Sequence, residues 1–255
     1  MKYSKNFIIT ANEQLDTRCV LLKMQPSDGE MPPMRPGQFV QVLVPAAKDT
    51  LLRLPISINN VEDGQLWLMV QMIGEGTKAL GSLPIGGALN LVLPLGNGFS
   101  VSEAKGRVLL VGGGVGIAPL LYTGRALREN GAEPIFLLGA RTADGVLERE
   151  LFEQIGRVLI TTEDGSAGER GFVTQHSALQ TERFDKIMVC GPKPMMVAVA
   201  RYARQKDIDC EVSLENMMAC GLGACLCCVE KTVKGNVCVC TEGPVFNINQ
   251  LTWQL

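Results

Sequence analysis

The chain has 255 residues, of which 46% are hydrophobic and 20% charged, and its formal net charge is −2 at pH 7. This composition is typical of a globular protein with two or three units and excludes a disordered chain, and the dispersed lysines and arginines exclude the basic stripe that nucleic-acid binding needs. No apolar run is long enough to span a membrane, and an alternating pattern rather than a signal-peptide core follows the first residues, so we expect a cytoplasmic protein.

The first stretch of the chain, up to about residue 102, contains short alternating apolar segments separated by Pro-Gly, Asp-Gly and Gly-Gly turns. The expected strands are 7–10, 19–24, 39–44, 55–58, 66–72 and 89–93. Short, evenly spaced strands of this kind are typical of a compact antiparallel β-barrel. We therefore expect an all-β domain over residues 1–102.

The second stretch, residues 103–214, alternates apolar strands with helices. The expected strands are 107–111, 134–138, 157–162, 186–190 and 210–214, and the expected helices are 118–130, 148–155 and 195–206. This alternation predicts an α/β domain with a doubly wound parallel sheet.

Two turns of this second stretch are candidates for binding a nucleotide. Gly112, Gly113, Gly114 and Gly116 connect the first strand to a helix, where bare N–H groups and the helix dipole would hold a pyrophosphate. Ile117 stands where the standard dinucleotide-binding fingerprint has its third glycine, so that fingerprint is not met.

The other turn is Cys190-Gly191-Pro192, at the end of the fourth parallel strand. Ligands of open parallel sheets bind at that edge, so the turn is a candidate for shaping a cofactor pocket. For both turns, the alternative interpretation is a tight connection with no binding role.

The third stretch, from about residue 215, holds six of the nine cysteines, all between Cys220 and Cys240. Cys220, Cys225 and Cys228 have the Cys-x4-Cys-x2-Cys spacing of plant-type two-iron clusters, and Cys238 or Cys240 is available as the fourth ligand. The two glycines after Cys220 permit positive φ and a close approach of backbone N–H groups to sulfur. The spacing predicts a [2Fe-2S] cluster and the transfer of single electrons.

A structural zinc site is the main alternative for this segment. Cys225 and Cys228 with Cys238 and Cys240 would supply four tetrahedral sulfurs. That assignment leaves Cys220 and its glycines without a role, which favours the cluster. A disulfide framework is disfavoured, because the chain is far longer than the small secreted domains that need one.

The remaining cysteines, Cys19, Cys190 and Cys210, lie in apolar, strand-like surroundings, where buried inert thiols are the usual case. His176 is the single histidine, which argues against a histidine-based metal or hydrolase site. We expect it at the surface or at a helix start.

The order of the motifs along the chain resembles that of the ferredoxin-NADP reductase superfamily. The motifs are Arg53-Leu-Pro-Ile-Ser57, Ile73-Gly-Glu-Gly-Thr77, Pro94-Leu-Gly-Asn-Gly-Phe99, the glycine turn and Cys-Gly-Pro-x-Pro-Met. The cysteine set followed by Glu-Gly-Pro-Val-Phe at 242–246 resembles, within that superfamily, the electron-transfer subunits of NAD-dependent, class 1B dihydroorotate dehydrogenases. The resemblance covers essentially the whole chain.

The resemblance implies an oxidoreductase subunit of pyrimidine (UMP) biosynthesis. An FMN-containing catalytic partner would oxidise dihydroorotate, and this chain would pass the electrons through [2Fe-2S] and FAD to NAD, in a heterotetramer of two subunits of each kind. No residue of this chain would act on dihydroorotate itself. The implied cluster ligands are Cys220, Cys225, Cys228 and Cys240, with Cys227 and Cys238 as spectators.

The resemblance also implies an FAD site in the barrel. Its expected residues are Arg53, Leu54, Pro55, Ile56, Ser57, Val70, Gln71, Met72, Gly76 and Thr77. The family usually has Arg where Leu54 stands and Leu-Tyr-Arg where 70–72 stand, so two cationic contacts to the cofactor are missing. We expect Arg53 and the backbone N–H groups of the turn 74–77 to compensate.

For the nicotinamide, the resemblance implies contacts from the glycine turn and from Cys190, Gly191 and Pro192, with Cys190 near the reacting carbon. Arg141 would suit a 2′-phosphate, whereas Asp144 would not, and NAD is preferred on the family match. The implied domains are a FAD-binding barrel (1–102), a NAD-binding domain (103–214) and a cluster-binding unit (215–255).

Two alternative functions remain at this stage. One is the small flavin and iron-sulfur subunit of a ferredoxin-dependent NADP reductase or a sulfide dehydrogenase, which shares the architecture. The other is a zinc-bearing interaction module without enzymatic activity.

Overall fold

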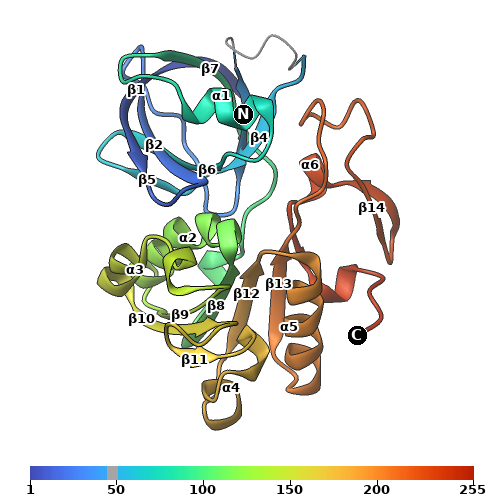
Figure 1. Ribbon diagram of the computed structural model, residues 1–255. Coiled ribbons are helices and arrows are strands. Elements are labelled where there is room, and N and C mark those ends of the chain that lie inside the picture. Colours follow the sequence, from blue (N-terminus) through green and yellow to red (C-terminus); the bar gives the residue numbers. More distant parts are fainter. Residues whose placement is uncertain (45–50) are drawn as a thin grey trace.

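The computed structural model describes residues 1–44 and 51–255, and three parts follow one another along the chain (Figure 1). The first part is a seven-stranded antiparallel sheet that curls into a barrel, with strand order β4-β3-β7-β1-β2-β6-β5. Its strands are β1 (Tyr3–Gln14), β2 (Cys19–Pro26), β3 (Phe39–Leu43), β4 (Leu54–Ser57), β5 (Asn60–Glu62), β6 (Gln65–Gln71) and β7 (Ala88–Leu95). The predicted barrel is confirmed.

Every second side chain along the strands points into the barrel, and these side chains fill its interior. In β7, Leu89, Leu91 and Leu93 are buried while the residues between them are not, as the two-residue period of a strand requires. Two elements of this part were not expected, the short strand β5 and the helix α1 (Glu75–Gly81). A three-residue strand and a seven-residue helix containing two glycines leave almost no periodic pattern to detect.

The second part is a mostly parallel sheet with strand order β11-β10-β9-β8-β12-β13-β16. Its strands are β8 (Arg107–Gly113), β9 (Glu133–Ala140), β10 (Arg157–Thr162), β11 (Glu169–Arg170), β12 (Lys186–Cys190), β13 (Asp209–Ser213) and β16 (Val245–Asn247). Its helices are α2 (Ala118–Glu129), α3 (Arg149–Ile155), α4 (Ala178–Thr181) and α5 (Lys193–Gln205). The predicted doubly wound sheet is confirmed.

Both faces of this sheet are covered, so its central strands are buried throughout. Leu120 of α2 and Phe152 of α3 pack with Leu110 on one face, whereas Val199 of α5 packs with Leu109 on the other. The helices α2 and α5 each have a proline in the first turn, where the missing N–H costs no hydrogen bond.

The cysteine-rich tail forms a small hairpin, β14 (Val229–Thr232) and β15 (Gly235–Cys238), and a helical turn, α6 (Val239–Glu242). The tail does not remain apart from the second part, because β16 pairs antiparallel with β13 at the edge of the parallel sheet. Phe246 of β16 is buried in the same core as Val212 of β13. The sequence pattern does not reveal this return, since a three-residue strand carries no periodicity.

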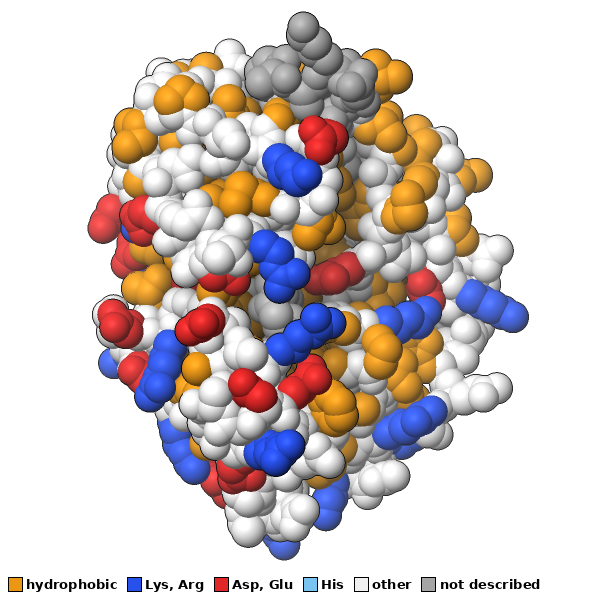
Figure 2. Space-filling model, in the orientation of Figure 1, with side chains coloured by type: hydrophobic (Ala, Val, Ile, Leu, Met, Phe, Trp, Pro, Cys, Tyr) orange, Lys and Arg blue, Asp and Glu red, His pale blue; other side chains and the backbone are white. Residues whose placement is uncertain are grey.

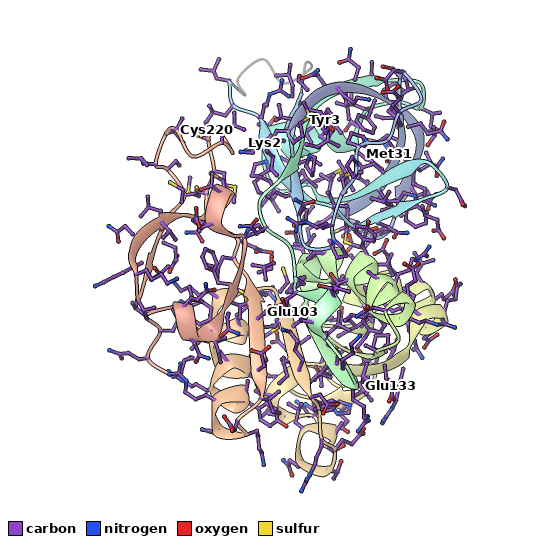
Figure 3. The ribbon with its side chains drawn as sticks, turned by 180° about the vertical axis from the view of Figure 1, so that it is seen from behind. Lys2, Tyr3, Met31, Glu103, Glu133 and Cys220 are labelled. Carbon is purple, nitrogen blue, oxygen red and sulfur yellow. The ribbon has the colours of Figure 1, made fainter. Side chains whose placement is uncertain are left out.

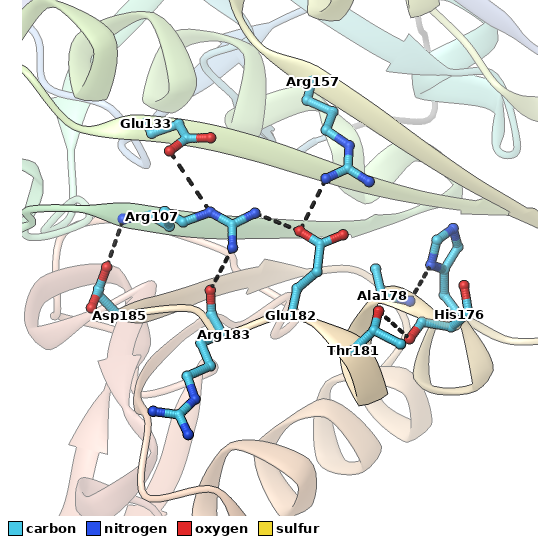
Figure 4. Close-up of polar contacts among 10 residues, drawn as sticks. Arg107, Glu133, Arg157, His176, Ala178, Thr181, Glu182, Arg183 and Asp185 are labelled. Atoms are coloured by element: carbon cyan, nitrogen blue, oxygen red, sulfur yellow. Dashed lines mark hydrogen bonds and ion pairs between the residues drawn. The ribbon is translucent and has the colours of Figure 1, made fainter.

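A network of ion pairs and hydrogen bonds joins the amino ends of the parallel strands, opposite the glycine turn (Figure 4). The guanidinium of Arg107 pairs with Glu182, and Arg157 donates to the same carboxylate at 3.0 Å. The backbone N–H of Arg107 donates to Asp185 Oδ2 at 2.7 Å. These contacts brace the edge that lies away from the candidate site.

His176 lies at the start of α4, where its Nδ1 accepts from the N–H of Ala178 at 3.1 Å. The helix-start prediction is therefore correct, but the residue is buried rather than on the surface, and burial lowers its pKa. Within residues 1–44 and 51–255, no helix is long and apolar enough to cross a membrane.

Candidate functional site

The two predicted nicotinamide-binding turns lie side by side at the carboxyl ends of β8 and β12. The two strands are neighbours, and Gly112 pairs with Cys190. Because the strand order reverses between them, this edge is where open parallel sheets bind ligands. The structure thus brings together all the residues predicted for NAD: Gly112, Gly113, Gly114, Gly116, Cys190, Gly191 and Pro192.

Glycine is required where these two turns touch. A Cβ on Gly116 would lie 2.5 Å from the Cα of Gly191 and 2.7 Å from the carbonyl oxygen of Cys190, so no side chain fits. Gly114, by contrast, has a φ of +56° and open space around it. Gly116 therefore allows the two loops to pack closely together. The backbone at Gly114, in contrast, is open to the approach of a pyrophosphate.

Cys190 is a buried thiol beside a carboxylate. Its Sγ lies 3.9 Å from Oε1 of Glu215, and burial together with this neighbour raises its pKa well above the ordinary value. Burial also raises the pKa of Cys19 to about 11 and that of Cys210 still further. All three thiols are buried, as predicted, and their raised pKa values favour the neutral form near pH 7. The contact of Cys190 with nicotinamide stays a prediction.

The tail carries its sulfur atoms near Cys220, on the side that faces the barrel (Figure 3). Backbone N–H groups of the tail donate to the sulfurs of the predicted ligands. Leu222 donates to Sγ of Cys220 at 3.3 Å, and Gly223 donates to Sγ of Cys240 at 3.2 Å. The N–H of Cys240 donates to Sγ of Cys228 at 3.4 Å. Thiolate donors surrounded by N–H···S bonds suit an iron-sulfur cluster, so these residues fit that group.

The loop owes its shape to residues with positive φ, namely Gly221 at +68°, Gly223 at +85° and Leu226 at +57°. The role predicted for the two glycines is confirmed. Leu226 is the unusual member, because a branched side chain seldom adopts this conformation. The loop is therefore held in a shape that its sequence only partly favours.

The cysteines differ in their readiness to ionise. The N–H bond from Leu222 lowers the pKa of Cys220 to about 6, so this thiol is mostly a thiolate at neutral pH. Burial raises the pKa of Cys240 to about 12, so metal binding has to drive off its proton. Of the two candidates for the fourth ligand, Cys240 is hydrogen-bonded to the loop of the other ligands, through the N–H of Gly223 and Sγ of Cys228, whereas Cys238 is partly exposed on β15. This difference favours Cys240.

In the described part of the chain, no three His, Cys, Asp or Glu side chains converge on a single point suited to one metal ion. A two-iron cluster takes only two protein ligands per iron, so this finding does not conflict with the cluster assignment. A structural zinc ion would require four ligands around one centre.

The predicted flavin strand, β4, lies at the end of the barrel sheet. All four of its residues, Leu54–Ser57, are half-buried. An edge strand presents unpaired backbone groups along one side. The half-buried surface of this edge strand fits a flat, amphipathic ring system.

Val70 and Arg53, both predicted for the flavin site, make contacts within the protein. Val70 is fully buried in the barrel core, so its side chain cannot line a cofactor in this structure. The strand β6 places Val70 on its inner face, which the sequence motif did not reveal. The guanidinium of Arg53 donates to Asn90 Oδ1 at 2.6 Å and to the Asn90 carbonyl at 3.0 Å. These hydrogen bonds engage part of the Arg53 guanidinium, which was expected to replace the missing arginine at the cofactor.

The other predicted flavin residues lie around α1 and the end of β6. The sulfur of Met72 packs against Gly81 of α1. A Cβ built on Gly81 would lie only 2.6 Å from that sulfur. Gly76 and Thr77 are in the first turn of α1, whose N–H groups have no partners within the helix. Thr77 Oγ1 accepts from the N–H of Gly74 at 3.0 Å and so fixes this turn. Gln71 is half-buried at the end of β6.

A polar contact that the sequence did not predict joins the barrel to the second part just after β4. Asn59 is fully buried, and its Nδ2 donates to Oε2 of Glu148 at 2.8 Å and to the Ala118 carbonyl at 3.3 Å. Glu148 has a φ of +53°, and burial raises its pKa to about 7. Asn59 thus connects the predicted flavin strand to the start of α2, which follows the glycine turn.

A second missed residue, Asn97, holds the tail against the barrel. Its Nδ2 donates to the carbonyls of Thr241 and Glu242, both at 3.1 Å, and its N–H donates to the Gly243 carbonyl at 2.6 Å. Asn97 lies inside the Pro94–Phe99 motif, whose sequence alone did not indicate a role. The motif therefore positions the segment that carries Cys240.

Comparison with known proteins agrees with this geometry. Residues 215–252 match the iron-sulfur cluster binding domain of dihydroorotate dehydrogenase B, and residues 110–201 match the oxidoreductase NAD-binding domain. The electron transfer subunit of dihydroorotate dehydrogenase B (NAD(+)) from Shouchella clausii is 42% identical over 85% of this chain and 86% of its own length. The subunit of the same name from Caldanaerobacter subterraneus is 40% identical over 83% of this chain and 84% of its own length.

One similar solved structure is that of an NADH-dependent reduced ferredoxin-NADP oxidoreductase, reported in connection with flavin-based electron bifurcation. It has a TM-score of 0.86 and 31% sequence identity, over 97% of this chain and 90% of that chain. A flavohemoglobin from Malassezia yamatoensis has a TM-score of 0.67 at 20% identity, over 80% of this chain and 57% of that chain, which shows the shared fold alone. The identity and coverage of the curated relatives decide the family: this chain belongs to the electron transfer subunits of NAD-dependent dihydroorotate dehydrogenase B.

Proposed function

We propose that this chain passes electrons from a catalytic partner subunit to NAD during the oxidation of dihydroorotate in pyrimidine biosynthesis. The observation that carries the proposal is that the cysteine loop and the glycine-turn edge are both held against one barrel, by Asn97 on one side and by Asn59 on the other. When bound, the [2Fe-2S] cluster exchanges single electrons, NAD takes a hydride, and FAD converts between the two.

The residues of this chain have separate tasks in that scheme. Cys220, Cys225, Cys228 and Cys240 hold the cluster, and the loop N–H groups stabilise the charge on its sulfurs. The cluster-binding unit is 215–255, with its last strand anchored in the parallel sheet.

The barrel, residues 1–102, binds FAD through the accessible side of β4 and the first turn of α1, including Pro55, Ser57, Gly76 and Thr77. Residues 103–214 bind NAD along the glycine turn, where the open backbone at Gly114 receives the pyrophosphate. Pro192 is exposed beside that turn and borders the nicotinamide end.

The partner subunit contains FMN in this proposal, and two copies of each chain form a heterotetramer. Large exposed apolar side chains around the cysteine loop support a docking face: Met217 is 84% exposed, Leu226 64% and Leu222 47%. Hydrophobic side chains gather at the upper right of Figure 2, where Figure 1 places the loops of the tail. Exposed apolar patches mark interaction surfaces, and this one would bring a partner close to the cluster.

Cys240→Ser tests the relay. The variant should lose electron transfer from dihydroorotate to NAD in the complex by at least about tenfold, because a hydroxyl is a poor cluster ligand. NADH oxidation by artificial acceptors should remain, since it needs only the flavin and nicotinamide sites. Equal loss of both activities would mean that the cluster is structural. Cys227→Ser, at an exposed cysteine outside the ligand set, serves as the control.

The second candidate is a subunit of a ferredoxin-linked NADP reductase, which the 31% identical structure over 97% of the chain favours. Purification with its natural partner distinguishes the two functions. Reduction of NAD by dihydroorotate supports the pyrimidine enzyme, whereas exchange of electrons with ferredoxin and NADP supports the alternative.

A further inference from the structure

Gln41 lies where the cysteine loop meets the barrel. It is in the middle of β3, paired with Pro55 of the predicted flavin strand on one side and with Val92 of β7 on the other. Val40 and Val42 point into the barrel core, so the side chain of Gln41 points out of the barrel.

On that outer side the cysteine loop covers Gln41. A Cβ on Gly221 would lie 2.7 Å from Cγ and 2.9 Å from Nε2 of Gln41, which places the carboxamide against the backbone next to Cys220. The loop can approach this closely only because residue 221 is a glycine with a φ of +68°.

The carboxamide has no partner for its polar atoms. Gln41 is fully buried, and neither Nε2 nor Oε1 has a hydrogen bond in the part of the chain that the structure describes. Leaving two buried polar atoms unpaired is costly, and a leucine of similar size would avoid the cost. A polar side chain at this position therefore indicates that a ligand supplies the missing partner.

We propose that Gln41 is a positioning residue for the iron-sulfur cluster, whose Nε2 donates an N–H···S hydrogen bond to a sulfur beside Cys220. The inference rests on the proposed cluster site. Sulfur is the acceptor that this site offers, and amide donors at cluster sulfurs are among the determinants of the reduction potential. The bond stabilises the additional negative charge of the reduced cluster, so it raises the potential.

The position of Gln41 gives this bond a role in the relay. Gln41 is a direct strand neighbour of Pro55, so one residue connects the cysteine loop with the strand proposed to hold the flavin. A higher cluster potential favours uptake of an electron from the partner subunit, and the rigid β3–β4 pairing keeps the donor in place.

The test replaces Gln41 with leucine and measures the midpoint potential of the cluster by an EPR-monitored redox titration of the anaerobically purified, cofactor-loaded complex. We expect Gln41→Leu to lower the midpoint and change the EPR spectrum of the reduced cluster, with iron and flavin content unchanged. Gln65→Leu, on β6, is the matched control and should change neither measurement.

Gln41→Met provides a second replacement without a donor if the leucine variant does not assemble its cluster. An unchanged midpoint and EPR spectrum in either fully loaded apolar variant would overturn the role of Gln41. Absence of a [2Fe-2S] signal from the unaltered complex would instead overturn the proposed function, so the two failures are distinguishable. A higher Tm of cluster-free Gln41→Leu than of the cluster-free parent would support the proposal, because that replacement removes the unpaired polar atoms.

Discussion

Glu148 shows how much of the site depends on single buried polar groups. Its Oε2 accepts from Asn59, while its Oε1 is buried with no hydrogen bond among the described residues. Burial raises its pKa from 4.5 to about 7, against the opposing effects of Asn59 and Lys23, with Glu13 adding a small further rise. A raised carboxyl pKa adds stability below pH 4.5, and that stability is lost as pH rises through about 7.

Replacing Glu148 with glutamine should therefore remove this pH dependence. We expect the parent protein to lose on the order of 2 kcal/mol of unfolding free energy between pH 4.5 and 8 through this group, and Glu148→Gln to recover most of it at pH 8. Urea unfolding at pH 5 and pH 8 measures the effect. Glu103→Gln, at an exposed carboxylate, is the control and should not alter the difference between the two pH values. A parent-like pH difference in Glu148→Gln would contradict the assignment.

Residues whose chemistry is encoded in local spacing could be predicted from the sequence, whereas residues whose environment is built by distant segments could not. The cysteine spacing and the glycine turn are local patterns, and the structure brings each set together. Gln41 instead looks like an outward-facing polar residue of a barrel strand, because the loop that buries it comes much later in the chain. Val70 is the opposite case: its side chain is buried in the barrel core, and motif position alone does not say which face of a strand a residue occupies.

At the scale of elements, the glycine turn after β8 depends on contact with the turn after β12. Gly116→Ala would place its Cβ against the backbone of Gly191 and Cys190, which cannot move aside as a side chain could. We expect the variant to weaken NADH binding by at least about tenfold, roughly 1.4 kcal/mol, while retaining iron and flavin. Titration of the cofactor-loaded protein with NADH measures the change. Unaltered NADH affinity would mean that these two turns do not form the binding edge.

The elements themselves were predictable to different degrees. The long strands and the helices α2 and α5 follow strong periodic patterns, so their predicted bounds differ from the observed ones by only a few residues. The elements β5, α1 and β16 are short, and their formation depends on pairing or packing with other segments. Tertiary contact rather than local preference decides such elements.

At the scale of the whole molecule, the apolar side chains around the cysteine loop predict where the partner docks. Met217→Asp or Leu222→Asp should weaken assembly with the catalytic subunit by at least about tenfold, because a charge would be buried in an apolar contact. Anaerobic size-exclusion chromatography of the mixed subunits measures complex formation. Ile85→Asp changes a residue that is 67% exposed on a barrel turn and should leave assembly intact. Equal weakening by all three variants would point to general destabilisation.

The return of the tail into the parallel sheet through β16 has a consequence for how this protein can be divided. The cluster-binding segment is fastened at both ends, by β13 before it and by β16 after it. A protease cut in the loop 215–228 would leave both fragments associated. Removing the segment altogether would expose the hydrogen-bonding edge of β13 and invite pairing with other chains. The segment therefore cannot be grafted or deleted as an independent cassette, and any exchange of clusters between related reductases has to include the strand that closes the sheet.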